Sequence, residues 1–102
     1  MAFVRISIMI PQAGQEARVD ELLKDLVNFY QGRPGFITAY RLSADPHAAV
    51  KRVGRVSVWE TEEDAHRTAS EQHDLSVQAE LKLLVQDATH EEYSFIGTPA
   101  GG

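Results

Sequence analysis

The chain has 102 residues, of which 43% are apolar and 25% are charged, as is usual for one globular domain. Ten Lys and Arg against fifteen Asp and Glu give a formal net charge of -5, which opposes binding to nucleic-acid phosphates. The absence of cysteine excludes disulfides, thiolate zinc sites and a cysteine nucleophile. We therefore expect no nucleic-acid partner and no thiol chemistry.

The N-terminus begins with a strand pattern and not with a basic segment followed by an apolar run, so we expect no signal peptide. No apolar stretch approaches the roughly 20 residues that a membrane-spanning helix requires. A chain without cysteine also suits a reducing compartment. We expect a cytoplasmic protein with no membrane partner.

Residues 3–10 alternate between two faces and predict the first strand. One face carries Val4, Ile6, Ile8 and Ile10, and the other carries Phe3, Arg5, Ser7 and Met9. A helix is expected from about residue 15 to residue 31, because apolar residues recur there at helical spacing: Val19, Leu22, Leu23, Leu26, Val27 and Tyr30. Gly32 and Pro34 end this helix.

Two further strands are predicted at residues 36–42 and 51–60, separated by a loop that contains Asp45-Pro46. Thr61 and the three acidic residues after it are typical of a helix start. We expect this second helical region to break near His73 before continuing with a second apolar stripe. A last strand at residues 91–97 precedes a short tail, residues 98–102.

The resulting order, βαββαβ, predicts an α+β fold of the ferredoxin-like, split βαβ type, with residues 1–97 as one domain. Right-handed crossovers place the first and third strands at the centre of one antiparallel sheet, with the helices on a single face. We assign that face to the aliphatic row, Val4, Ile6, Ile8, Ile10, Val56 and Val58.

The opposite face would then carry aromatic residues with no helix to cover them: Phe3, Phe36, Tyr40 and Trp59. At about 150 Å² or more for each aromatic side chain, this patch exceeds what a monomer usually exposes. The sequence therefore predicts a homodimer joined through these sheet faces.

Short motifs in this order resemble the antibiotic biosynthesis monooxygenase family. They are FVRISIMI followed by Gly14, RPGF with YRL after it, SVWET, EEDA and QHDLSVQ. The resemblance covers nearly the whole chain and implies a dimeric α+β barrel, in which two ferredoxin-like sheets pack face to face. The family includes cofactor-independent oxygenases of aromatic, polyketide-like or quinol molecules, as well as haem-degrading enzymes. Haem degradation is disfavoured, because this chain has Ser7, Thr68 and Gln78 where the haem-degrading branch has asparagine, tryptophan and histidine.

Several side chains are candidates for a ligand pocket. Trp59, with the small hydroxyl residues Ser7 and Ser57 beside it, suits a flat aromatic ligand, although core packing alone also explains a tryptophan. Arg5 and Arg55 lie on adjacent central strands and need anionic partners if they are buried. Those partners are either a ligand or carboxylates such as Glu91 and Glu92.

The four histidines show no zinc-binding spacing and no phosphate-binding glycine loop is present, so we expect no metal and no cofactor. The resemblance implies His73 as a catalytic base, and an exposed or helix-capping histidine is the alternative. In an oxygenase, Arg5 or Arg55, with Tyr40, would stabilise an oxyanion, and Ser7, Ser57, Trp59 and Arg55 would bind the substrate. Two interpretations of function remain. The protein is either a cofactor-independent monooxygenase of a small aromatic molecule, or a non-catalytic small-molecule-binding or structural barrel.

Overall fold

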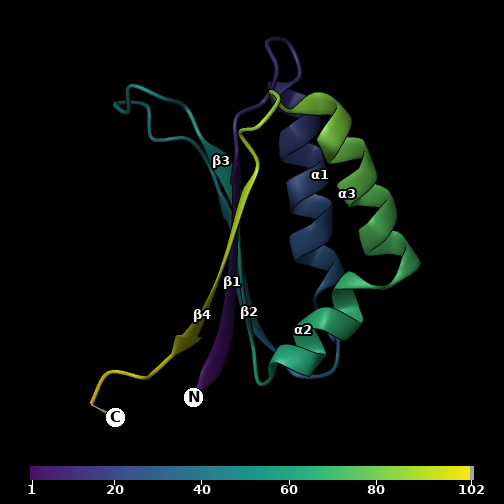
Figure 1. The fold of residues 1–102 in the computed structure, drawn as a ribbon, viewed down its shortest axis with the longest axis vertical. Coiled ribbons are helices and arrows are strands. Elements are labelled where there is room, and N and C mark those ends of the chain that lie inside the picture. The colour runs from purple at the N-terminus through teal and green to yellow at the C-terminus, as the bar shows by residue number, and fades with distance from the viewer. Residues whose placement is uncertain (102) are drawn as a thin grey trace.

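The computed structural model describes residues 1–101, which form one layer of sheet and one layer of helices (Figure 1). The elements in chain order are β1 (Ala2–Met9), α1 (Glu16–Phe29), β2 (Phe36–Leu42), β3 (Val53–Trp59), α2 (Glu62–Ala69), α3 (Gln72–Leu84) and β4 (Glu91–Gly97). The strands form an antiparallel sheet in the order β2-β3-β1-β4. The predicted α+β, ferredoxin-like βαββαβ fold is confirmed.

Local sequence signals set the ends of the helices. Gly32 has a φ of 78° just after α1, a conformation that glycine adopts without strain. The Thr61 hydroxyl caps α2 by accepting a hydrogen bond of 3.1 Å from the backbone N–H of Asp64. The break expected near His73 lies slightly earlier, at Ser70 and Glu71. The predicted tail follows β4, and its last residue, Gly102, lies outside the described residues.

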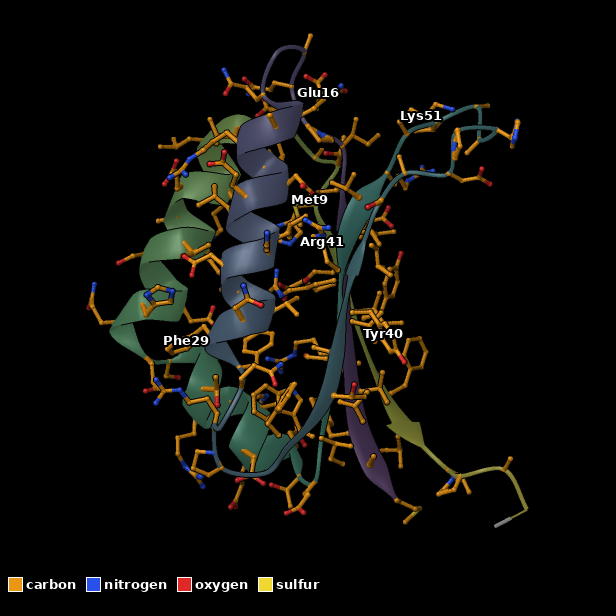
Figure 2. All side chains as sticks on the ribbon, turned by 180° about the vertical axis from the view of Figure 1, so that it is seen from behind. Met9, Glu16, Phe29, Tyr40, Arg41 and Lys51 are labelled. Atoms are coloured by element: carbon orange, nitrogen blue, oxygen red, sulfur yellow. The ribbon has the colours of Figure 1, made fainter. Side chains whose placement is uncertain are left out.

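The sheet face that packs against the helices is opposite to the one predicted. Phe3, Ser7 and Met9 of β1 are buried under the helices, and so are Ser57 and Trp59 of β3. The aliphatic row (Val4, Ile6, Ile8, Val56 and Val58) lies on the face that no helix covers. In Figure 2, Met9 points toward the helices. The prediction was wrong because β1 has large apolar residues on both faces, so alternation separates the faces without saying which one the helices cover.

A bulge in β2 explains a second difference. Phe36 lies opposite Trp59 and Thr38 lies opposite Val58, which is the next residue on β3. Ile37 therefore has no partner on β3. Phe36 therefore packs in the core, with its ring centroid 5.4 Å from that of Trp59. Tyr40 lies on the opposite face, points away from the helices (Figure 2) and is 63% exposed. Of the aromatic residues predicted for the uncovered face, only Tyr40 is there.

The core lies between the sheet and the helices. Its buried apolar residues are Phe3, Met9, Val19, Leu22, Leu23, Leu26, Tyr30, Trp59, Ala65, Val77, Leu81 and Val85. Tyr30, at the end of α1, makes an edge contact with Trp59 at 5.3 Å between ring centroids. Within residues 1–101, none of the helices combines the length and the apolar character needed to cross a membrane.

The turn before β2 approaches α2 so closely that we expect it to require glycine. Gly35 has a φ of 76°, and a Cβ atom there would lie 2.0 Å from the Asp64 carboxylate. Gly32→Ala should cost about 1 to 2 kcal/mol, because the left-handed conformation alone disfavours other residues. Gly35→Ala should cost at least about 1 kcal/mol more, because it adds a clash in a tightly packed region. Urea unfolding of both variants measures this difference, and equal losses would contradict the close approach.

Candidate functional site

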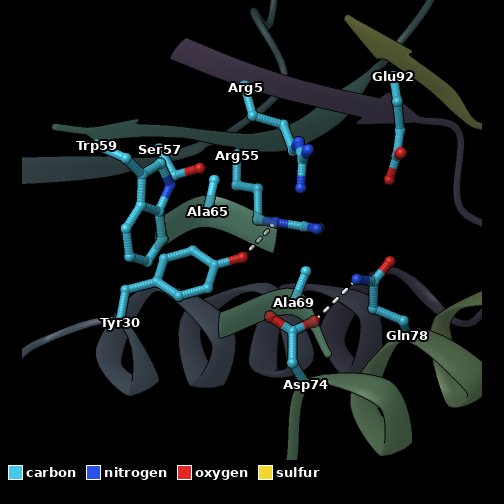
Figure 3. Close-up of a pocket in the computed structure, with 10 residues that line it drawn as sticks. All are labelled: Arg5, Tyr30, Arg55, Ser57, Trp59, Ala65, Ala69, Asp74, Gln78 and Glu92. Carbon is cyan, nitrogen blue, oxygen red and sulfur yellow. Dashed lines mark hydrogen bonds between the residues drawn. The ribbon is translucent and has the colours of Figure 1, made fainter. Parts of the chain in front are cut away.

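A cavity of about 190 Å³ lies between the inner face of the sheet and the helices (Figure 3). The sheet contributes its floor from β1, β3 and β4, while α1, α2 and α3 contribute the walls and roof. The small side chains of Ala65 and Ala69 on α2 leave the space open. The lining residues are Arg5, Tyr30, Arg55, Ser57, Trp59, Ala65, Ala69, Asp74, Gln78 and Glu92.

Strand register makes the floor of this cavity polar. Arg5 lies directly opposite Ser57, and Ser7 lies directly opposite Arg55, so two polar cross-strand pairs occupy the middle of a sheet face whose ends are apolar. The Ser7 hydroxyl donates a hydrogen bond of 3.2 Å to Glu92 on β4. The helices therefore cover a strip of polar residues as well as an apolar core.

Arg55 is the most unusual residue of the floor. It is 3% exposed, and its Nε donates a hydrogen bond of 2.9 Å to the Tyr30 hydroxyl. Its Nη1 is buried without a hydrogen-bond partner. Among residues 1–101, no carboxylate forms an ion pair with Arg55 or Arg5. Glu91 and Glu92, which the sequence suggested as partners of these arginines, therefore do not fill that role within the chain. A buried charge without a counterion is costly, and an occupant of the cavity would offset that cost.

Asp74 on α3 presents the opposite charge from the roof. It is 1% exposed, and its Oδ1 accepts a hydrogen bond of 2.8 Å from the side-chain amide of Gln78. Its Oδ2 is buried without a partner. Burial raises the pKa of Asp74, although the Gln78 hydrogen bond and the charges of Arg55 and Arg5 oppose this rise. Figure 3 shows Asp74 and the two arginines pointing into the same space from opposite layers.

Tyr30 completes the polar group around Arg55. Burial raises the pKa of the Tyr30 hydroxyl, while the positive charge of Arg55 lowers it. Because burial is the larger influence, Tyr30 is a neutral hydroxyl near pH 7. It can therefore hold the guanidinium group of Arg55 in place without neutralising its charge.

The structure brings together most of the predicted site residues but not all of them. Arg5, Arg55, Ser57 and Trp59 line the cavity, and Ser7 is buried beneath it. Tyr40 lies on the far face of the sheet because of the bulge at Ile37.

His73 lies outside the cavity, although Asp74 follows it directly. A step of one residue turns a helix by about 100°, so adjacent residues point in different directions. The His73 side chain is 46% exposed, its Nε2 lies 3.0 Å from Asp25 Oδ1, and its ring stacks on Phe29 at 4.5 Å between centroids. These contacts join α3 to α1 on the outer surface of the helical layer.

Sequence reasoning did not identify Tyr30, Asp74 and Gln78 as site residues, and it named Glu92 only as a possible partner of the arginines. A signal for Asp74 is present, because Asp74, Val77 and Leu81 follow helical spacing and share the buried stripe of α3. A carboxylate on an apolar stripe is a buried charge that needs an explanation. Glu92 gives no comparable signal, because its position follows from the pairing of β4 with β1.

No group of three or more His, Asp or Glu side chains within residues 1–101 is arranged to hold a metal ion. The cavity instead offers two cations, Arg5 and Arg55, together with the carboxylates of Asp74 and Glu92. This arrangement suits a small polar ligand that both accepts and donates hydrogen bonds.

The buried carboxylate predicts a particular dependence of stability on pH. The pKa of Asp74 in the folded protein is raised above 3.8, so folding favours the protonated carboxyl. The free energy that this preference contributes to stability is lost as the pH rises through the raised pKa. Asp74→Asn removes that dependence. The stability of the variant relative to the wild type should therefore increase between pH 4 and pH 8, as measured by urea unfolding. A difference that does not change with pH would show that Asp74 is not a buried, poorly compensated acid.

Comparison with known proteins supports the fold. No family model matches this chain, and no curated protein matches its sequence significantly. Solved structures do match. SnoaB from Streptomyces nogalater, a cofactor-independent oxygenase, is 16% identical with a TM-score of 0.79 over 97% of this chain and 95% of that one. Rv0793 from Mycobacterium tuberculosis is 10% identical with a TM-score of 0.84 over the full length of both chains.

A protein from Nitrosomonas europaea, provisionally named an antibiotic biosynthesis monooxygenase, is 14% identical. Its TM-score is 0.84 over 99% of this chain and 94% of that one. Such low identities establish a shared fold, while the chemistry must be argued from the residues of the cavity. The chain therefore has the fold of the antibiotic biosynthesis monooxygenases, to which its sequence motifs pointed.

Proposed function

We propose that this protein is a cofactor-independent monooxygenase that acts on a small aromatic molecule in the cavity between the sheet and the helices. The supporting observation is the presence of two buried and only partly satisfied groups, Arg55 Nη1 and Asp74 Oδ2, in one cavity walled by aromatic rings. Native proteins rarely leave such groups without partners. The shared fold with SnoaB, a cofactor-independent oxygenase, supports the same reaction class.

Each group has a role in such a reaction. The ionised carboxylate of Asp74 takes the proton from the substrate hydroxyl, because burial raises its affinity for a proton. Arg55 stabilises the resulting phenolate oxygen, and Arg5 adds a second positive charge to the same cavity. Trp59 and Tyr30 supply flat apolar surfaces for the ring.

The phenolate then reacts directly with dioxygen. Its ring carbon gains a C–O bond to dioxygen, and the distal oxygen takes the proton back from Asp74 to give a hydroperoxide. Loss of the hydrogen on that carbon and cleavage of the O–O bond release one water molecule and leave a carbonyl group. The substrate is oxidised, dioxygen supplies both the oxygen atom inserted and the oxygen atom of water, and no other reductant is needed.

We also propose that a second copy of the chain covers the sheet face without helices. None of the side chains that β1 and β3 present on this face is charged, and Tyr40, Tyr93 and Phe95 extend it as exposed aromatics. A contiguous exposed apolar patch of this kind marks an interaction surface. A second copy offers the same apolar centre, so the two can pair about a two-fold axis with no charged side chain of β1 or β3 between them.

Oxygen uptake with a panel of anthrones, naphthols, quinols and one-ring phenols tests the proposed reaction. Asp74→Asn should lower turnover by about 10² to 10⁴, the usual contribution of a positioned base. Arg55→Met should lower it by about 10² to 10³, the usual effect of losing an oxyanion donor. His73→Ala is the matched control, because it changes the neighbouring residue outside the cavity and should retain turnover.

The outcome can contradict the proposal in two ways. Loss of activity in His73→Ala with retention in Asp74→Asn would transfer the role of base to His73. Absence of uptake with every compound would remove the enzyme interpretation and leave a protein that binds a small molecule.

Light scattering at micromolar concentration tests the dimer. The wild type should have the mass of two chains, and Val56→Asp should yield monomers, because it places an unpaired charge in the centre of the interface. Leu83→Asp is the matched control, since Leu83 is also exposed and apolar but lies on α3. A monomeric wild type would contradict this proposal.

A further inference from the structure

We infer that the ligand of this cavity is a one-ring phenol whose hydroxyl group lies between Arg55 and Asp74. This inference rests on the proposed function and names the substrate class for the same site. It follows from the volume of the cavity, from the unpartnered atoms of two residues that line it and from the signs of their charges.

The volume limits the ligand to a single ring. A cavity of about 150 Å³ is sufficient to hold benzene, whereas pockets for larger, drug-sized ligands begin at about 300 Å³. The cavity measures about 190 Å³, so it accommodates one ring with one or two small substituents. Ala65 and Ala69 create this space, but the rings of Trp59 and Tyr30 bound it.

The unpartnered atoms specify the polar group. Arg55 Nη1 needs a hydrogen-bond acceptor, and Asp74 Oδ2 needs a donor when the carboxylate is ionised. A hydroxyl group supplies both through one oxygen atom. An ether or a hydrocarbon of the same size would leave Asp74 without a donor, and burying an unsatisfied polar group weakens binding.

The charges favour a phenol over a carboxylic acid. A carboxylate would accept from Arg55, but its second oxygen would face the carboxylate of Asp74 on the opposite wall (Figure 3). Two like charges in a buried site repel each other unless a proton is taken up. A phenol instead enters neutral and brings the proton that Asp74 can accept.

The shape of the walls suits an aromatic ring. Trp59 and Tyr30 meet edge to face at 5.3 Å between ring centroids, and both line the cavity. A flat ring between them and the alanines of α2 contacts apolar surface on its sides, while its hydroxyl points toward the arginines. The polar and apolar parts of the lining thus match the two parts of a phenol.

Anaerobic calorimetry separates ligand binding from oxidation. The probe is 4-nitrophenol, used at a pH below its own pKa so that it enters neutral. The comparison compounds are 4-nitroanisole, which lacks the hydroxyl, 4-nitrobenzoate, which carries a carboxylate, and 2-hydroxyanthraquinone, which has three rings. We expect 4-nitrophenol to bind the wild type at least about tenfold more tightly than each of the others. Quenching of Trp59, the sole tryptophan, should accompany its binding.

Two variants test the individual contacts. Arg55→Met should weaken binding of 4-nitrophenol at least about tenfold, because it removes the donor to the ligand oxygen. Asp74→Asn keeps the shape of the side chain but removes its charge. It should therefore increase the affinity for 4-nitrobenzoate severalfold. His73→Ala should change none of these affinities.

Equal binding of 4-nitrophenol and 4-nitroanisole, or tighter binding of 2-hydroxyanthraquinone, would overturn the inference. Unchanged binding of 4-nitrophenol by Arg55→Met would also overturn it. The experiments distinguish failure of this inference from failure of the proposed function. Selective binding of phenols without oxygen uptake refutes only the oxygenase, and oxygen uptake confined to polycyclic compounds refutes only the one-ring ligand.

Discussion

The guanidinium group of Arg55 is buried between a sheet and a layer of helices, and no carboxylate among residues 1–101 pairs with it. Its side chain donates a hydrogen bond to the Tyr30 hydroxyl, whose position depends on where α1 ends. The carboxylate of Asp74 on α3 carries the opposite charge, but the cavity forms a gap between it and Arg55, and the two side chains form no ion pair. Closing that gap would give a simple buried ion pair, so the gap is the feature that requires a functional explanation.

The fold maintains this gap through the size of the side chains around it. Ala65 and Ala69 on α2 are too small to fill it, while the packing of Trp59, Tyr30 and Phe36 holds the helices and the sheet apart at one end. On the outer surface, Arg33 packs over Phe29 at the end of α1 and pairs with Glu71, immediately before α3, at 3.0 Å. These contacts fix α3 against α1 and so fix the position of Asp74.

The element order, the strand pairing and most element boundaries could be predicted from the sequence, because hydrophobic periodicity and cap residues are local signals. The orientation of the sheet could not. β1 carries Ile6 on one face and Phe3 and Met9 on the other, and either set could form a core until the helices are placed. The bulge at Ile37 has no clear local signal, yet it moves Tyr40 to the face opposite Phe36.

The candidate site was partly predictable for the same reasons. Arg5, Arg55, Ser57 and Trp59 could be grouped, because register between neighbouring strands follows from alternation. The partners supplied by the helices were missed, since the rotation of α3 decides whether His73 or Asp74 faces the sheet. The apolar stripe through Val77 and Leu81 contains that information, and Asp74 belongs to it. The resemblance to a family directed attention to the histidine instead.

The central claim is that Arg55 and Asp74 meet a ligand and not each other. A crystal structure of the protein soaked anaerobically with 4-nitrophenol tests it most directly. The account predicts the ligand hydroxyl within hydrogen-bonding distance of both Arg55 Nη1 and Asp74 Oδ2, with the ring against Trp59. A direct Arg55–Asp74 ion pair that closes the cavity, or 4-nitrophenol bound elsewhere, would contradict it.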